Sequence, residues 1–172
     1  MANNPAEYTS IYEKLRNERK LSREAVSSML MEQGIDLKPS RLGRIENEEF
    51  PITPREVLIL SKVYGEPSLC NHYCANECDI GKKYVPEIKT KDLAHIVLEM
   101  LASLNSIETR QAQLIEITAD GNVDDSEIKD FVSIQKDLER ISVTVEAMQL
   151  WAEEMIAEGK IDIKKYNQIK NG

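Results

Sequence analysis

The sequence predicts an all-α protein in which short helices near the N-terminus are followed by a long antiparallel helical hairpin. Charged residues make up 30% of the 172 residues and aromatic residues only 5%, which suits a helical protein with a charged surface better than a β-sandwich. Capping residues, prolines and glycines divide the first 80 residues into short amphipathic segments. After residue 90, apolar residues recur at alternating steps of four and three, as in coiled coils.

The N-terminal region begins with three predicted helices. The first runs over about residues 8–20. Ser22 is a good N-cap for the second helix, which Gly34 ends. Pro39 fits the first turn of the third helix, which runs to about residue 48.

Two further helices complete this N-terminal domain, which we assign to residues 1–80. Thr53 caps the fourth helix, Pro54 begins it, and Glu56 at its third position completes a capping box. Gly65 ends this helix, and a short fifth helix that carries the cysteines begins near residue 68.

The apolar pattern predicts two long helices over residues 91–158. A linker at residues 81–90 precedes them, and a polar tail at residues 159–172 follows them. Each long helix has a heptad stripe: Leu93, Val97, Met100, Leu104, Ile107, Gln111 and Leu114 in the first, and Phe131, Ile134, Leu138, Ile141, Val145, Met148, Ala152 and Met155 in the second. The break at residues 119–122 is short, which predicts an antiparallel hairpin with the two stripes facing each other.

Each long helix also carries apolar residues outside its stripe. They are Leu98, Leu101 and Ile115 in the first helix and Val132, Val143, Leu150 and Trp151 in the second. A two-helix hairpin has a single internal seam, so this additional apolar surface needs another partner. We expect a homodimer that forms through a four-helix bundle. Packing against the chain's own N-terminal domain is the alternative.

Residues 15–47 carry the pattern of a helix-turn-helix, in which the second helix inserts into the major groove of DNA. Two short amphipathic segments are joined by a turn that contains Gly34. The second segment places basic side chains on one face and Leu42 and Ile45 on the other. Double-stranded DNA is therefore the partner that we expect for this domain.

Three motifs in this region have the order and spacing of a known family. They read Leu15-Arg16-Asn17-Glu18-Arg19, Leu21-Ser22-Arg23-Glu24 and Arg44-Ile45-Glu46-Asn47. In these motifs residues 11–64, about a third of the chain, resemble the Xre, or lambda-repressor-like, family of helix-turn-helix domains. The chain departs from the family pattern at Arg23, where a glutamine is usual, at Glu48, where a glycine is usual, and in a longer stretch over residues 34–39.

The resemblance implies that the third helix lies in the major groove, and it assigns roles to individual residues. The candidates for contacts with base edges are Ser40, Arg41 and Arg44, and the candidates for phosphate contacts are Arg16, Arg19, Arg23 and Lys38. The resemblance places Leu42 and Ile45 in the core and implies that Glu46 ties the helices together.

The net charge of −8 is distributed unevenly along the chain. Residues 1–65 carry ten basic and ten acidic residues, so the whole excess of acid lies in residues 66–172. A neutral DNA reader needs its positive charges on one face, because phosphate contacts supply much of the affinity. No apolar run is long enough to span a bilayer and the start lacks a signal-peptide pattern, so we expect no membrane partner and a cytoplasmic location.

Cys70, Cys74 and Cys78 are four residues apart, so on a helix they form one stripe. Three alternatives follow: the thiols line a packing face, they hold zinc or an iron–sulfur cluster, or they sense redox changes. His95 and Asp79 are candidates for a fourth ligand, although zinc sites favour more closely spaced cysteine pairs. Three cysteines do not form a closed set of disulfides.

No motif points to an enzyme, since the sequence contains no glycine-rich phosphate loop and no nucleophile credibly paired with a histidine. We therefore expect a sequence-specific transcriptional regulator that binds DNA as a dimer. One alternative is a helical adaptor that has lost DNA binding, which the long turn and the net acidity favour. The other is a regulator that senses metal or redox state through the cysteines.

Overall fold

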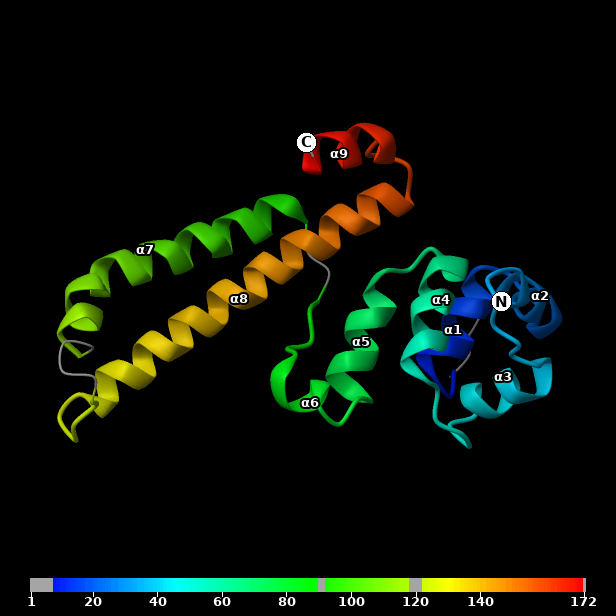
Figure 1. Ribbon diagram of the computed structural model, residues 1–172, viewed down its shortest axis with the longest axis horizontal. Coiled ribbons are helices and arrows are strands. Elements are labelled where there is room, and N and C mark those ends of the chain that lie inside the picture. The colour runs from blue at the N-terminus through cyan, green and yellow to red at the C-terminus, as the bar shows by residue number, and fades with distance from the viewer. Residues whose placement is uncertain (1–7, 90–91, 118–121, 172) are drawn as a thin grey trace, which may run out of the picture. The chain divides into compact units, whose positions relative to one another are not determined.

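The computed structural model of the protein describes residues 8–89, 92–117 and 122–171, and within these ranges it contains helices and no strand (Figure 1). The all-α prediction is thus confirmed for these residues. The chain forms two compact units, one up to Val85 and one from Pro86 onwards. The first unit contains α1 (Ile11–Glu18), α2 (Arg23–Glu32), α3 (Pro39–Glu46), α4 (Pro54–Tyr64), α5 (Ser68–Asn76) and α6 (Gly81–Tyr84).

The helices α2 and α4 begin and end at the residues that the sequence predicts. Ser22 begins α2 by accepting a hydrogen bond from the N–H of Ala25. Thr53 and Glu56 form the predicted capping box, in which the Thr53 N–H donates to the Glu56 carboxylate at 2.7 Å. Gly65 ends α4 in the left-handed conformation, with φ of 62°.

Two helices are shorter than predicted. The helix α1 ends at Glu18 rather than near residue 20, and α3 ends at Glu46 rather than near residue 48. Lys20 and Glu48 have φ of 55° and 59°, in the left-handed region that terminates a helix. A residue with a Cβ pays about 1–2 kcal/mol for this conformation, which explains why glycine is usual at the position of Glu48 in the family that the sequence resembles.

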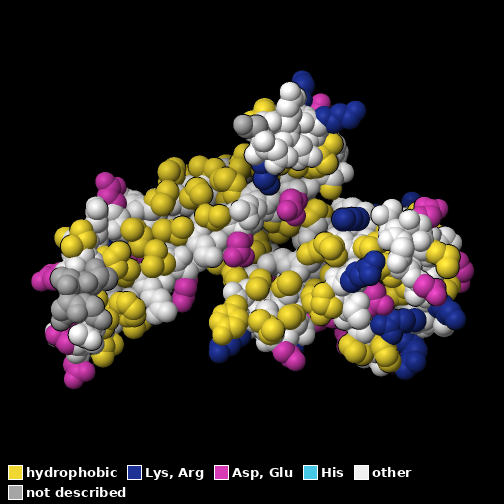
Figure 2. Space-filling model, in the orientation of Figure 1, with side chains coloured by type: hydrophobic (Ala, Val, Ile, Leu, Met, Phe, Trp, Pro, Cys, Tyr) yellow, Lys and Arg dark blue, Asp and Glu magenta, His cyan; other side chains and the backbone are white. Residues whose placement is uncertain are grey.

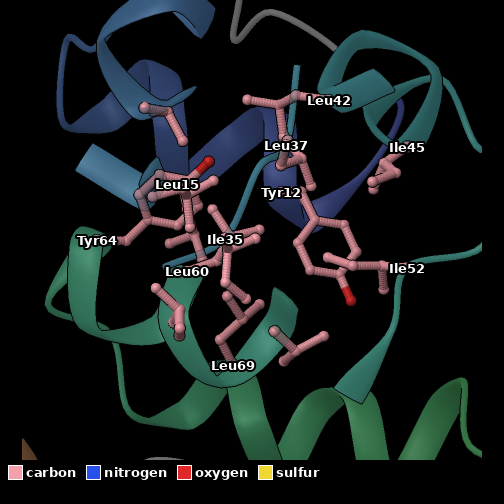
Figure 3. Close-up of a cluster of buried hydrophobic side chains, with 14 residues drawn as sticks. Tyr12, Leu15, Ile35, Leu37, Leu42, Ile45, Ile52, Leu60, Tyr64 and Leu69 are labelled. Carbon is pink, nitrogen blue, oxygen red and sulfur yellow. The ribbon is translucent and has the colours of Figure 1, made fainter. Parts of the chain in front are cut away.

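Fourteen buried hydrophobic side chains form one core in the first unit (Figure 3). They include Tyr12 and Leu15 of α1, Leu42 and Ile45 of α3, Leu60 and Tyr64 of α4 and Leu69 of α5. Burial of each leucine contributes about 1.5–3 kcal/mol. The helix α3 is held by its apolar side, as predicted, and its opposite side remains at the surface.

Part of the predicted linker at residues 81–90 is a helix. Residues 81–84 form α6, and the carbonyl of Cys78 accepts a hydrogen bond from the N–H of Lys82 at 2.8 Å. Gly81 packs so closely on α5 that an added Cβ would lie 2.0 Å from the carbonyl oxygen of Cys74. Only glycine allows this approach, so Gly81 determines where the chain turns back onto α5.

The second unit contains α7 (Leu93–Ile117), α8 (Ile128–Ala157) and α9 (Ile163–Lys170) (Figure 1). Ser106 contacts Asp137 and Arg110 contacts Ser133, so the residue number falls along α8 as it rises along α7. The two helices therefore run in opposite directions where they touch. Most of the break predicted at residues 119–122, namely residues 119–121, lies outside the described residues. The predicted polar tail at residues 159–172 contains the helix α9.

Apart from Ile134, the fully buried side chains along α7 and α8 are not members of the predicted heptad stripes. On α7 they are Ile96, Ser103 and Ile117, and on α8 they are Ile134, Asp137, Thr144 and Leu150. Several members of the predicted stripes are exposed instead, namely Leu93, Leu104, Phe131, Leu138 and Val145. The prediction that the two stripes face each other across the seam is therefore wrong for these five residues. No helix among the described residues is both long and apolar enough to cross a membrane.

Candidate nucleic-acid interface

The segment between α2 and α3 is long but anchored. Gly34 has φ of 79°, and the N–H of Ile35 donates to the carbonyl of Leu30 at 3.0 Å, which closes the end of α2. Beyond this point Ile35 and Leu37 are buried, while Asp36 and Lys38 are exposed. The additional residues thus alternate between core and solvent, and they fix the start of α3 on the core.

A buried carboxylate joins α3 to α1 and α2. Glu46 is fully buried, and Arg16 binds it with two hydrogen bonds, from Nε at 2.6 Å and from Nη2 at 3.0 Å. Arg23 donates a third hydrogen bond from its Nε at 2.7 Å. These bonds to a charged acceptor are among the stronger ones in proteins. The contacts confirm that Glu46 ties the helices together.

The same contacts determine the positions of two arginines that the sequence assigns to phosphate. Arg16 is buried, and its Nη1 also donates to the carbonyl of Leu21 at 3.0 Å. Arg23 lies against Gly43 of α3, where an added Cβ would lie 3.2 Å from Arg23 Nη1. We therefore assign Arg16 to the interior of the domain and Arg23 to the support of α3.

Arg19 and Arg41 are also bound within the protein. Arg19 Nε donates to the carbonyl of Tyr64 at 2.6 Å, near the end of α4. Arg41 binds both carboxylate oxygens of Glu56, at 3.0 and 3.2 Å. Burial raises the pKa of Glu56, but hydrogen bonds from Arg41 and Thr53 lower it by more, so the carboxylate has a pKa below its ordinary value. Arg41 thus links α3 to the start of α4.

The remaining candidates lie at the surface on and beside α3. Lys38 and Ser40 are exposed, and the side chain of Arg44 is 57% exposed. Arg44 lies over the ring of Phe50, with its Cζ 5.0 Å from the ring centroid, and its Nε is 3.8 Å from the carboxylate of Glu49. Ser40 and Arg44 are four residues apart and so lie on one side of the helix.

The sequence reasoning missed Phe50. Its ring lies beneath two guanidinium groups, those of Arg44 and of Arg41, whose Cζ is 4.6 Å from the ring centroid. Attraction between a cation and an aromatic ring holds both groups in place. The available signal was a phenylalanine, one of only two in the chain, placed four residues after the end of a helix that carries two arginines.

The two ends of α3 differ in charge. Lys38 precedes the helix, whereas Glu48 and Glu49 follow it and line a groove of about 470 Å³ together with Glu77, which follows α5. Tyr12 donates a hydrogen bond to Glu77 at 2.6 Å in the same groove. Phosphate would be repelled at this acidic end and attracted by Lys38 at the other end. Lys and Arg side chains gather over α1–α4 in Figure 2.

The three cysteines form no disulfide and are partly buried. Cys70 and Cys74 lie on α5, but Cys78 lies beyond the end of this helix at Asn76, so the prediction of one helical stripe is wrong for Cys78. Cys70 packs against the hydrophobic core and donates to Ser61 Oγ at 3.4 Å. Burial and the neighbouring thiols raise the pKa of Cys74, which disfavours the reactive thiolate. Among the described residues, no three His, Cys, Asp or Glu side chains are grouped so that they could hold a metal ion. Of the three alternatives, packing therefore fits the observed contacts best.

Comparison with known proteins adds no relative: no family model matches the chain, and neither does any curated protein or solved structure. The function is therefore argued from the chain's own residues.

Proposed function

We propose that this protein is a sequence-specific DNA-binding regulator that places the exposed side of α3 in the major groove and binds as a dimer. The observation that carries the proposal is the contrast between the two sides of α3. One side is fixed by the core and by two ion-pair networks, and the other presents Lys38, Ser40 and Arg44 to solvent. A rigid helix with a free polar side is what base readout requires.

The proposed contacts follow from the chemistry of these side chains. Arg44 is suited to the O6 and N7 acceptors of guanine, and Phe50 orients its guanidinium. Lys38 is suited to a phosphate beside the groove, and Ser40 to a base edge or a phosphate. Arg41 and Arg23 act in this proposal as positioning residues, because Glu56 and Glu46 hold them.

The test is selection of bound sequences from random duplex DNA by the full-length protein at moderate salt. Recovery of an inverted repeat, with half-sites about one helical turn apart, is the expected result, because a two-fold dimer places two equivalent helices on one side of the duplex. Failure of a folded protein to enrich any sequence would overturn the proposal.

Single substitutions separate base readout from phosphate contact. Arg44→Ala should weaken binding by about 1–3 kcal/mol and relax the preference at one base pair. Lys38→Ala should weaken binding to all sequences alike. It should also reduce the slope of the logarithm of the binding constant against the logarithm of the salt concentration by about one. The matched control is Lys62→Ala, an exposed lysine on α4, which should leave both properties unchanged. Equal effects of Arg44→Ala and Lys62→Ala in titrations followed by fluorescence anisotropy would contradict the assignment.

A helical adaptor is the second candidate, and one observation favours it. Four of the seven basic and polar residues assigned to DNA are bound to groups of the protein itself, namely Arg16, Arg19, Arg23 and Arg41. An adaptor would show weak DNA binding at low salt and no sequence preference, so the selection experiment separates the two candidates.

A further inference from the structure

The second unit buries polar side chains along its seam. Asp137 of α8 is only 3% exposed, and it accepts hydrogen bonds from Ser106 at 2.8 Å and from Arg140 at 3.3 Å. Arg110 Nε lies 3.6 Å from the same carboxylate. Ser103 is buried as well. The contacts across the seam therefore include an ion-pair network, and apolar side chains of both helices are left at the surface.

Three exposed apolar side chains come directly after buried polar ones along the chain. Each of three buried residues is followed directly by an exposed one, in the pairs Ser103 and Leu104, Asp137 and Leu138, and Thr144 and Val145. One residue corresponds to a rotation of about 100° around a helix, so both stripes are turned from the seam in the same sense. Because α7 and α8 run in opposite directions, rotation in the same sense brings both stripes to the same side of the pair.

This side defines one surface, which we call the hairpin face and which consists of Leu93 and Leu104 of α7 and Phe131, Leu138 and Val145 of α8. These side chains are between 37% and 50% exposed. Figure 2 shows hydrophobic side chains spread over much of α7 and α8. An apolar surface of this extent is rare on a monomer and marks a contact with another protein or another copy.

Two glutamates of α8 that follow residues of this face are turned away from it. Glu139 and Glu146 each come two residues after a buried residue, which turns them by roughly 200° from the seam, away from the hairpin face. The chain as a whole carries a net charge of −8, which opposes self-association wherever the acids meet. Turning these glutamates away lowers the repulsion between two copies that meet through α8.

The size of the face matches what a stable dimer needs. The helix α7 has 25 residues and is therefore roughly 37 Å long, and two helices side by side are about 20 Å wide. One side of the α7–α8 pair thus offers on the order of 700 Å² in each copy, close to the approximately 800 Å² that each partner contributes to a standard interface. A short peptide would leave most of this area uncovered.

We propose that the hairpin face is the surface on which a second copy of this chain docks, so that two α7–α8 pairs form a four-helix bundle. The proposal specifies the dimer of the proposed function, on which it rests for the role of the dimer. It differs from the sequence-based expectation, because residues of the heptad stripe itself make the contact between copies. The Asp137 network keeps these residues outside by occupying the seam within each copy.

The experiment is sedimentation equilibrium of the full chain, without DNA, for the wild type, Leu138→Glu and Leu98→Glu. Leu98 is the matched control: it is 65% exposed, but it comes two residues after buried Ile96 and so lies away from the hairpin face. We expect a dimer of the 19.6 kDa chain in the wild type and in Leu98→Glu, and a dissociation constant raised roughly hundredfold in Leu138→Glu.

Two results would overturn the proposal: a wild type that stays monomeric at high micromolar concentration, or a dimer that both substitutions leave equally strong. The first would assign the face to a different protein, and the second would move the dimer contact elsewhere. If circular dichroism shows that Leu138→Glu loses helix, Leu104→Glu tests the same face from α7. A dimer that binds no DNA would refute the proposed function and leave this inference standing.

Discussion

Each unit contains a carboxylate that is buried between arginines, and the two units use it differently. Glu46 receives Arg16 from α1 and Arg23 from α2, so its contacts join three helices around a core of fourteen apolar side chains. Asp137 receives Arg110 from α7 and an arginine from its own helix whose side chain is 70% exposed. Its contacts join only two helices, and the network itself takes up space in the seam.

The difference shows in the placement of apolar side chains. Among the described residues, seven exposed large hydrophobic side chains lie in the first unit and thirteen in the second. The first unit buries most of its large apolar side chains in one core and presents a polar surface on α3. The second unit leaves apolar surface open, which is what an assembly module needs. We therefore propose that recognition and assembly reside in different units.

The largest expected effect comes from removing the buried charge of the first unit. Glu46→Gln should lower the free energy of unfolding of this unit by about 3–5 kcal/mol, because two arginines lose their buried partner. Hydrogen exchange read by mass spectrometry should show lost protection in α1–α3 and unchanged protection in α7 and α8. The control is Glu49→Gln, whose ion pair with Arg44 is exposed and should contribute less than about 1 kcal/mol. Equal loss in the two variants would contradict the role of Glu46.

Local chemistry explains what could be predicted from the sequence of the first unit. Ser22, Glu56 and Gly65 act on helix ends through neighbours three or four residues away, so the pattern alone specified them. The roles of the arginines depend on partners far along the chain: Arg16 meets a carboxylate 30 residues away and Arg41 one 15 residues away. No local pattern distinguishes an arginine that is held in this way from one that is free to bind phosphate.

The second unit shows a different limit of prediction from the sequence. Its heptad repeat correctly indicated two long helices with apolar stripes, because periodicity depends only on the helix itself. Which side of a stripe turns inward depends on the partner helix, and here Asp137, Ser106 and Arg110 decide it through contacts between α7 and α8. A rotation of less than a third of a turn moves Leu104 and Leu138 from the seam to the surface, and the repeat does not record that rotation.

A smaller effect is expected from the buried charge of the second unit. Asp137→Ala should lower the free energy of unfolding of this unit by about 1–3 kcal/mol, since Arg140 can regain water when its partner is lost. Trp151, the single tryptophan, lies in α8, so its fluorescence during urea unfolding reports on this unit. Protein concentration must be held fixed, because the proposed dimer would add to the apparent stability.

The matched control for this change is Glu139→Ala, which removes an exposed carboxylate two residues away on the same helix and should change stability by no more than about 0.5 kcal/mol. If Asp137→Ala proved as harmless as its control, the ion-pair network would not determine which side of α7 and α8 turns inward. The structural role that we assign to the buried carboxylate of Asp137 would then be wrong, while that of Glu46 would be unaffected.

The smallest expected effect is a dependence of the first unit's stability on acid. The pKa of Glu56 lies below its ordinary value of 4.5, so the folded state favours the ionised carboxylate. The stabilisation is therefore complete above about pH 4.5 and is lost as the pH falls through the lowered pKa of the folded state. Glu56→Gln should make the stability of this unit fall less steeply below pH 4.5, measured by thermal unfolding of α3 and α4 through their amide NMR signals. Glu49→Gln should keep the wild-type slope, and the same slope in both variants would show that Arg41 and Glu56 do not stabilise α3.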